Sequence, residues 1–196
     1  MADTLIRRSP LQGYAARFAA LPGSVRLDEE PFIGMIDLWV DPATPGAVAA
    51  GKTLGIDGLP RTASTIVTGD DAAVIWLGPD EWLVTSRCRA PETLEAQLRD
   101  IVTEHGGAAV DVSAQRTTLR LRGEHAREVL AKGCSLDLHP KVFGAGAAAQ
   151  TMLGQAAVVL IPLSANGTDF RILVSSSYAR HLADWLIDAA EEFGRG

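Results

Sequence analysis

The residues with the clearest chemical potential are two adjacent carboxylates, Asp70 and Asp71, which follow Gly69. Neighbouring carboxylates raise each other's pKa and can act as an acid and a base. Asp80 and Glu81 follow a few residues later. A Gly-Asp-Asp run between two apolar segments is also typical of a hairpin turn, because aspartate side chains accept hydrogen bonds from nearby backbone. We therefore interpret Asp70 and Asp71 as turn residues and expect no catalytic residue in this chain.

Histidines and cysteines give no pattern typical of a metal site. A zinc site needs three or four converging ligands, usually at short spacings in sequence. The chain has scattered histidines, and none is at ligand spacing from a cysteine: His105, His125, His139, His181, Cys88 and Cys134. We expect no metal and no cofactor bound by this chain.

Two other short motifs resemble parts of known sites. Ser113 follows Asp111, but no Ser-His-Asp order can be inferred, and we interpret this serine as turn-forming. Gly144 to Ala149 reads GAGAAA, like part of a dinucleotide-binding loop. The true fingerprint follows a strand and opens a helix, whereas here LHPKVF precedes the glycines and a strand is expected after them. We interpret it as a flexible connection.

A row of arginines lies on one side of an expected strand from Arg116 to Arg122. Thr117, Leu119 and Leu121 alternate with it, and the arginine row consists of Arg116, Arg120 and Arg122, with Arg127 on a following helix. Charged edge strands are often solvated faces. Arginine is also enriched at interfaces and binds carboxylates with two hydrogen bonds. Both interpretations stay open, and we predict that the arginine row contacts a partner.

The N-terminal segment, about 31 residues, has a separate character. Ser9 can cap and Pro10 can begin a short helix with Leu11, Ala15 and Phe18 on one side. Such an arm either lies on its own domain or reaches a partner, and we expect the second. The partner contacts predicted in the arm are Leu5, Ile6, Pro10 and Leu11.

Composition limits the class of protein. Of 196 residues, 47% are hydrophobic, so the chain can bury a substantial core. The net charge of −6 argues against nucleic-acid binding, which usually needs a basic face. The longest apolar run, Ala156 to Leu163, is too short to cross a bilayer. Two cysteines cannot form a disulfide framework and are typical of a reducing cytoplasm, where we expect the protein.

The chain reads as a duplication. Leu54, Ile56 and Pro60 recur as Leu136, Leu138 and Pro140, and GPDEWLVTS (78–86) finds a counterpart in GTDFRILVS (167–175). Two amphipathic helices close the units, each followed by a glycine, Gly106 or Gly194. We predict an N-terminal arm at 1–31 and repeats at 32–107 and 108–196 in one compact domain.

Each repeat has the expected order strand, helix, strand, strand, helix. Strands joined by hairpins alternate with helices, which predicts an α+β fold of antiparallel or mixed sheets with helices packed on them.

The order of these elements resembles a known family. The run VDVSAQRTTLRLRGEHAREVLAKGCSLDLHP, its Gly/Ala stretch, the strand pair and the helix YARHLADWLIDAAEEFG resemble the folate-binding domain of glycine-cleavage aminomethyltransferases. With IRRSPL and WLGPDEWLV, the chain is most similar to the gamma subunits of heterotetrameric sarcosine oxidases over nearly its whole length. The resemblance implies a folate-binding-domain-like fold with duplicated, ferredoxin-like halves.

The resemblance also implies a role. Such complexes oxidise sarcosine to glycine with hydrogen peroxide, and release formaldehyde or form 5,10-methylenetetrahydrofolate. It implies alpha, beta and delta subunits as partners, with FAD, FMN, NAD, zinc and tetrahydrofolate in those subunits and no cofactor in this chain. The gamma subunit would be accessory.

Departures from the aminomethyltransferase pattern support that role. Those enzymes continue with His-Met-Gly where this chain has Ala114-Gln115-Arg116. Their paired aspartates fall at Gln155, Ala156 and Ala157, so the carboxylates are missing there, although Asp70 and Asp71 occupy the corresponding turn of the other repeat. The alternative is a stand-alone folate-binding, aminomethyltransferase-like protein.

Overall fold

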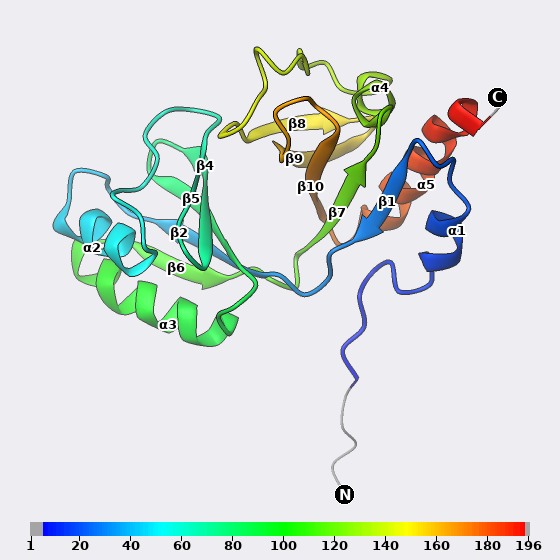
Figure 1. Cartoon of the computed structure of the whole chain (residues 1–196). Helices are drawn as coiled ribbons and strands as arrows, with labels where there is room; N and C mark the ends of the chain where they lie inside the picture. Colours follow the sequence, from blue (N-terminus) through cyan, green and yellow to red (C-terminus); the bar gives the residue numbers. More distant parts are fainter. Residues whose placement is uncertain (1–5, 195–196) are drawn as a thin grey trace, which may run out of the picture.

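The structure, a computed structural model, describes residues 6–194 and contains two five-stranded antiparallel sheets with helices packed on them (Figure 1). The elements in chain order are α1 (Ala15–Ala19), β1 (Arg26–Glu29), β2 (Gly34–Trp39), α2 (Pro45–Thr53), β3 (Ile66–Thr68), β4 (Ala72–Gly78), β5 (Glu81–Ser86), α3 (Pro91–Val102), η1 (Thr103–His105), β6 (Ala108–Asp111), β7 (Arg116–Arg122), α4 (Ala126–Ala131), β8 (Ala149–Leu153), β9 (Ala156–Pro162), β10 (Asp169–Ser175), α5 (Ala179–Ala190) and η2 (Glu191–Gly194). Over residues 6–194 no helix combines the length and apolarity needed to span a membrane. The expected α+β fold is confirmed.

The two sheets are copies of one pattern. The first sheet has the strand order β6-β2-β5-β4-β3, and the second has β1-β7-β10-β9-β8. Each strand of one sheet therefore has a counterpart at the same position in the other, as the duplication predicted.

The matching edge strands β1 and β6 are exchanged between the halves. β1 precedes β2 in the chain but pairs with β7, with Leu27 opposite Leu121. β6 precedes β7 but pairs with β2, with Ala109 opposite Leu38. The sheets thus divide the chain differently from the boundaries 1–31, 32–107 and 108–196. β1, within the assigned arm, belongs to the second sheet, and β6, at the start of the second repeat, belongs to the first.

The layers run helices, sheet, sheet, helices. α2 and α3 cover the outer face of the first sheet, and α4 and α5 cover that of the second, each pair enclosing its own apolar core (Figure 1). A third apolar cluster joins the inner faces of the two sheets and consists of Ile33, Met35, Ile75, Leu83, Val112, Ala148, Val159, Ile161 and Leu173. Because central strands are buried on both faces, runs such as Val158 to Ile161 are continuously apolar instead of alternating.

The pairing register corrects one equivalence drawn from the sequence. A gapless sequence alignment of residues 78–86 with residues 167–175 pairs Trp82 with Arg171. In the sheets Trp82 corresponds to Phe170, and both are fully buried against helices. The reason is hairpin length: two residues connect β4 to β5, whereas residues 163–168 connect β9 to β10.

The N-terminal segment forms its helix later than expected. α1 begins at Ala15 after Tyr14, and the Ser9 hydroxyl donates a hydrogen bond to the Glu29 carboxylate (2.6 Å) instead of capping a helix. Leu11 is 2% exposed within the core of the second half, and Phe18 packs on that core. The segment from Leu11 onward is therefore part of this chain's own fold.

Candidate functional site

The Asp70 and Asp71 carboxylates do not form an acid–base pair. Both lie in the β3–β4 hairpin turn, where Gly69 N–H bonds the Ala72 carbonyl, so the turn interpretation is confirmed. Asp71 accepts two hydrogen bonds from Arg89, at 2.6 and 2.8 Å, and this guanidinium holds the pKa of Asp71 below its ordinary value. Asp70 is exposed. The Asp71 carboxylate is thus committed to fixing the turn.

The other sequence motifs have structural roles. Ser113 donates to Asp111 (2.5 Å) and accepts the Met35 N–H (2.9 Å), which makes it the turn residue expected between β6 and β7. The glycines at 144–149 lead directly into β8 and open no helix. Within residues 6–194, no three His, Cys, Asp or Glu side chains are grouped closely enough to hold a metal ion.

The arginine row has carboxylate partners inside the chain. Arg120 donates two hydrogen bonds to Asp169, at 3.0 and 2.7 Å, and this pairing raises the pKa of the Arg120 guanidinium. Arg122 pairs with Asp28. Arg116 has no carboxylate within 4.0 Å among the described residues. Two of the three arginines are therefore neutralised by this chain, and only Arg116 offers an uncompensated charge.

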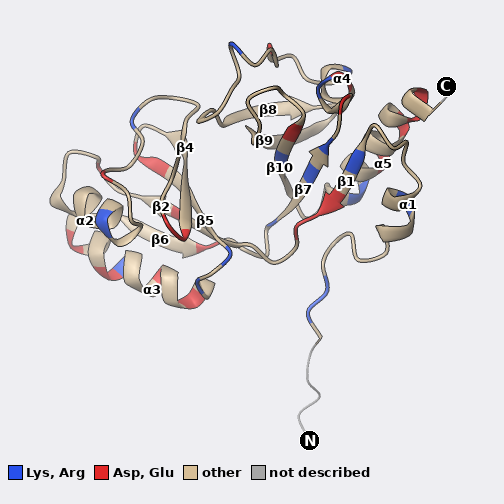
Figure 2. Cartoon of the chain, in the orientation of Figure 1, with Lys and Arg blue, Asp and Glu red and all other residues tan. Residues whose placement is uncertain are grey.

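Glu30 is the centre of an ion-pair network that the sequence did not suggest. It lies between β1 and β2, and its side chain is 10% exposed. Its oxygens meet Arg171 of β10 at 2.7 Å, Arg87 after β5 at 2.5 Å and Arg120 of β7 at 3.6 Å. Burial alone would raise the pKa of Glu30, but the guanidiniums of Arg171 and Arg87 hold it below its ordinary value. Because these residues are far apart in the sequence, only the fold brings them together. Figure 2 shows basic and acidic positions on the neighbouring strands β1, β7 and β10.

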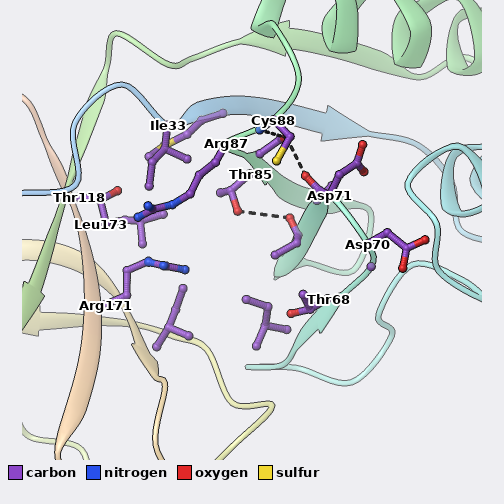
Figure 3. Close-up of a pocket in the computed structure, with 17 residues that line it drawn as sticks. Ile33, Thr68, Asp70, Asp71, Thr85, Arg87, Cys88, Thr118, Arg171 and Leu173 are labelled. Atoms are coloured by element: carbon purple, nitrogen blue, oxygen red, sulfur yellow. Dashed lines mark hydrogen bonds between the residues drawn. The ribbon is translucent and has the colours of Figure 1, made fainter.

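This network lies beside a cleft between the two sheets. The cleft has a volume of about 220 Å³ and is lined by residues of β2, β3, β4 and β5 on one side and β7, β9 and β10 on the other. Arg87 and Arg171 extend to the same side of the cleft as Thr118 and Leu173 (Figure 3). The Thr118 hydroxyl is fully buried and has no hydrogen-bond partner among the described residues. The cleft therefore has apolar walls, a basic end at Arg87 and Arg171, and another polar end at the β3–β4 turn, where Asp70 and Asp71 lie.

A second recess, which we call the basic groove, lies beside the N-terminal segment. It includes four arginines, of which none has a carboxylate within 4.0 Å among residues 6–194: Arg7, Arg8, Arg116 and Arg180. Pro10 and the exposed Phe32 also line it, and the Arg7 guanidinium lies 4.4 Å from the Phe32 ring centre. Arg180 donates to the Pro10 carbonyl (3.3 Å), which ties the segment to α5.

The partner contacts predicted from the sequence divide into four groups. Pro10 and Arg116 meet in the basic groove, and Ile6 is 79% exposed just before it. Leu11 is buried in this chain and has no surface to offer a partner. Leu5 lies outside the described residues. Arg120 and Arg122 belong to internal ion pairs.

The chain matches proteins of one kind over most of its length. The family model described as the sarcosine oxidase, gamma subunit family, matches residues 39–192. The sarcosine oxidase subunit gamma of Corynebacterium sp. (strain P-1) is 35% identical, covering 97% of this chain and 93% of the relative. That of an Arthrobacter species is 34% identical with the same coverage.

Solved structures agree with these matches. A chain of the heterotetrameric sarcosine oxidase from Corynebacterium sp. U-96, in complex with pyrrole 2-carboxylate, superposes with a TM-score of 0.88 at 36% identity, covering 98% of each chain. The aminomethyltransferase T of the Bartonella henselae glycine cleavage system gives a TM-score of 0.61 at 16% identity, over 91% of this chain and 49% of that one, and shares the fold. On the sequence and structural matches together, the chain belongs to the sarcosine oxidase gamma subunit family.

Proposed function

We propose that this chain is an accessory subunit of a heterotetrameric sarcosine oxidase. The observation that carries the proposal is the match over 98% of the chain to one chain of such a complex. The assembly would demethylate sarcosine oxidatively to glycine, with hydrogen peroxide and either formaldehyde or 5,10-methylenetetrahydrofolate as products. Alpha, beta and delta subunits are the proposed partners, and FAD, FMN, NAD, zinc and tetrahydrofolate are proposed to belong to them.

The arrangement of the carboxylates favours an accessory role over folate chemistry in this chain. Asp71 is paired with Arg89. The positions that correspond to Asp70 and Asp71 in the second half are Ala156 and Ala157. The inter-sheet cleft, at about 220 Å³, is also smaller than the roughly 300–1,000 Å³ usual for sites of drug-sized ligands. A stand-alone folate-binding protein would need a larger site.

The basic groove is the docking surface that the geometry favours. It gathers four arginines in a chain whose net charge is −6, so a partner segment rich in carboxylates would be attracted there. Phe32 is 45% exposed and has φ +63°, a left-handed conformation that is strained for a bulky side chain. Strained, exposed residues cluster at binding surfaces, and aromatic residues and arginine are enriched at interfaces. Ile6 adjoins this groove.

Co-expression tests the role and the surface together. A tagged form of this chain, produced with the alpha, beta and delta subunits, should co-purify with them in one stoichiometric complex that produces peroxide from sarcosine. In a second arm, Arg8→Glu with Arg116→Glu should lower the yield of complex about tenfold or more, because the charge that attracts the partner is reversed.

Two outcomes are decisive. The control is Lys52→Glu with Lys141→Glu, which makes the same change of net charge at exposed sites outside the groove and should leave the yield unchanged. Elution of the unaltered chain without its partners would contradict the accessory role. Equal yields from the groove variant and the control would leave the role intact but contradict the groove as the docking surface.

A further inference from the structure

The inter-sheet cleft has a charged end and an apolar body. Ile33, Met35, Ile161 and Leu173 supply aliphatic walls from both sheets. Arg87 and Arg171 enter the cleft beside Thr118 and Leu173, where their guanidiniums approach one another (Figure 3). A site of this kind suits a ligand with one polar group and a compact apolar remainder, because apolar walls contribute burial and a few polar groups fix orientation.

The ion-pair network leaves positive charge at this end. Three guanidiniums, those of Arg87, Arg120 and Arg171, meet two carboxylates, those of Glu30 and Asp169. One positive charge therefore remains unmatched within the network. Arg171 uses Nε to bond Glu30, and its two terminal nitrogens have no partner among the described residues. The bond to Glu30 thus fixes the position of the Arg171 guanidinium, and its two terminal nitrogens stay free to donate to a ligand.

Thr118 provides an independent observation. Its side chain is 0% exposed and lines the cleft, yet its hydroxyl has no hydrogen-bond partner in the described part of the chain. A buried hydroxyl without a partner is costly, and buried polar groups in folded proteins are nearly always paired. The corresponding residue in the first half is Met35, so the fold does not require a polar group here. A ligand acceptor would complete the pairing.

We propose that the cleft binds a small organic carboxylate with a compact apolar body, such as an aromatic acid. The carboxylate accepts hydrogen bonds from Arg87, Arg171 and the Thr118 hydroxyl, and the apolar body packs between Met35 and Leu173. Guanidinium groups suit this acceptor because they bind carboxylates with two parallel hydrogen bonds. The site is separate from the basic groove, and it stands whether or not the chain is an accessory subunit.

Titration with benzoate and with its neutral analogue benzamide tests this site. The chain is labelled with ¹³C at its methionine methyl groups, of which Met35 lines the cleft and Met152 is exposed elsewhere. Benzoate should shift the Met35 signal and leave that of Met152 unchanged, and benzamide should bind about tenfold or more weakly, because the charged hydrogen bonds are lost. Sulfate, which lacks an apolar body, should bind more weakly than benzoate.

Two variants separate the site from the fold. Thr118→Val keeps the shape of the side chain and removes the unpaired hydroxyl, so unfolding should occur at the same or higher denaturant concentration while benzoate binds several-fold more weakly. Arg87→Gln, at a side chain that is 54% exposed, should weaken the binding of benzoate about tenfold. The control Arg99→Gln on α3 should leave benzoate binding unchanged. Equal binding of benzoate and benzamide, stronger binding of sulfate, or unchanged benzoate affinity in both cleft variants would overturn the proposal.

Discussion

Equivalent positions in the two sheets carry opposite electrostatics. In the second sheet Arg120 of β7 pairs with Asp169 of β10 through two hydrogen bonds. The corresponding residues of the first sheet are Asp37 of β2 and Glu81 of β5, which occupy the same diagonal of the strand pairing. There, burial and then the Asp37 charge raise the pKa of Glu81 above its ordinary value. One half thus has an ion pair where the other has two neighbouring acids.

This difference shows what a duplicated fold keeps and what it changes. Strand order, the exchanged edge strands and the large buried side chain at Trp82 and Phe170 are common to both halves. The charges on the inner faces of the sheets differ between the two halves. The first sheet leaves Asp37 and Glu81 beside the exposed Trp39, whereas in the second sheet Arg120 and Arg122 pair with carboxylates of the same chain. Backbone pairing and outer cores therefore fix the frame, and the inner faces are free to diverge.

The largest effect should come from truncating the matched core residues. Phe170→Ala and Trp82→Ala each remove a fully buried aromatic side chain and should lower the free energy of unfolding by about 3–5 kcal/mol. Trp82 also donates a hydrogen bond to the Pro60 carbonyl (2.8 Å), so its loss should be at the upper end. Urea unfolding followed by circular dichroism measures both.

The same experiment tests whether the halves unfold together. The shared inner cluster and the exchange of β1 and β6 join them, so both variants should unfold in one transition. Two separate transitions, with only the mutated half shifted, would show that the halves are independent.

The sequence could predict the frame because its signals are local. Alternation, hairpin residues and the apolar stripes of α3 and α5 indicated the duplicated α+β fold, and Gly106, at φ +74°, ends its helix as expected. The exchange of edge strands could not be predicted in this way. β1 and β6 are only four residues long, and their pairing partners depend on packing between distant segments.

The cleft and its ion-pair network could not be predicted from local sequence patterns for the same reason. Glu30 meets Arg87 and Arg171 across 57 and 141 residues of sequence separation, the difference of their residue numbers. The arginine row was recognisable as a strand face, but its partners Asp28 and Asp169 come from the neighbouring strands on either side. Alternation predicts which face a residue occupies and says nothing of which strand lies beside it.

A smaller effect should separate the two charge arrangements. Asp169→Asn removes the partner of Arg120 and should lower the free energy of unfolding by about 1–2 kcal/mol. Glu81→Gln removes a like-charge neighbour of Asp37 and should raise it by about 0.5 kcal/mol near neutral pH. Both substitutions keep the shape of the side chain, so the two variants differ from the wild type in charge and not in packing. Changes of the same sign in the two variants would mean that local charge does not distinguish the halves.

The smallest effect should be a difference in pH dependence between Glu81 and Glu30. The pKa of Glu81 is raised on folding, so the folded state holds this proton more tightly than the unfolded state. The contribution of Glu81 to the free energy of unfolding is therefore lost as the pH rises above 4.5, the ordinary pKa of a glutamate. Glu30 has a lowered pKa, so its contribution is present above 4.5 and is lost as pH falls below it.

Urea unfolding between about pH 3 and about pH 7 would measure these slopes in the wild type and in two variants. The advantage of Glu81→Gln over the wild type should be near zero at the acidic end, where Glu81 is protonated, and should grow to a few tenths of a kcal/mol near neutrality. The deficit of Glu30→Gln should be greatest near neutrality and shrink as the medium becomes acidic, because the wild type then loses its Glu30 carboxylate as well. Parallel curves for all three proteins would show that neither carboxyl group feels the charges that surround it.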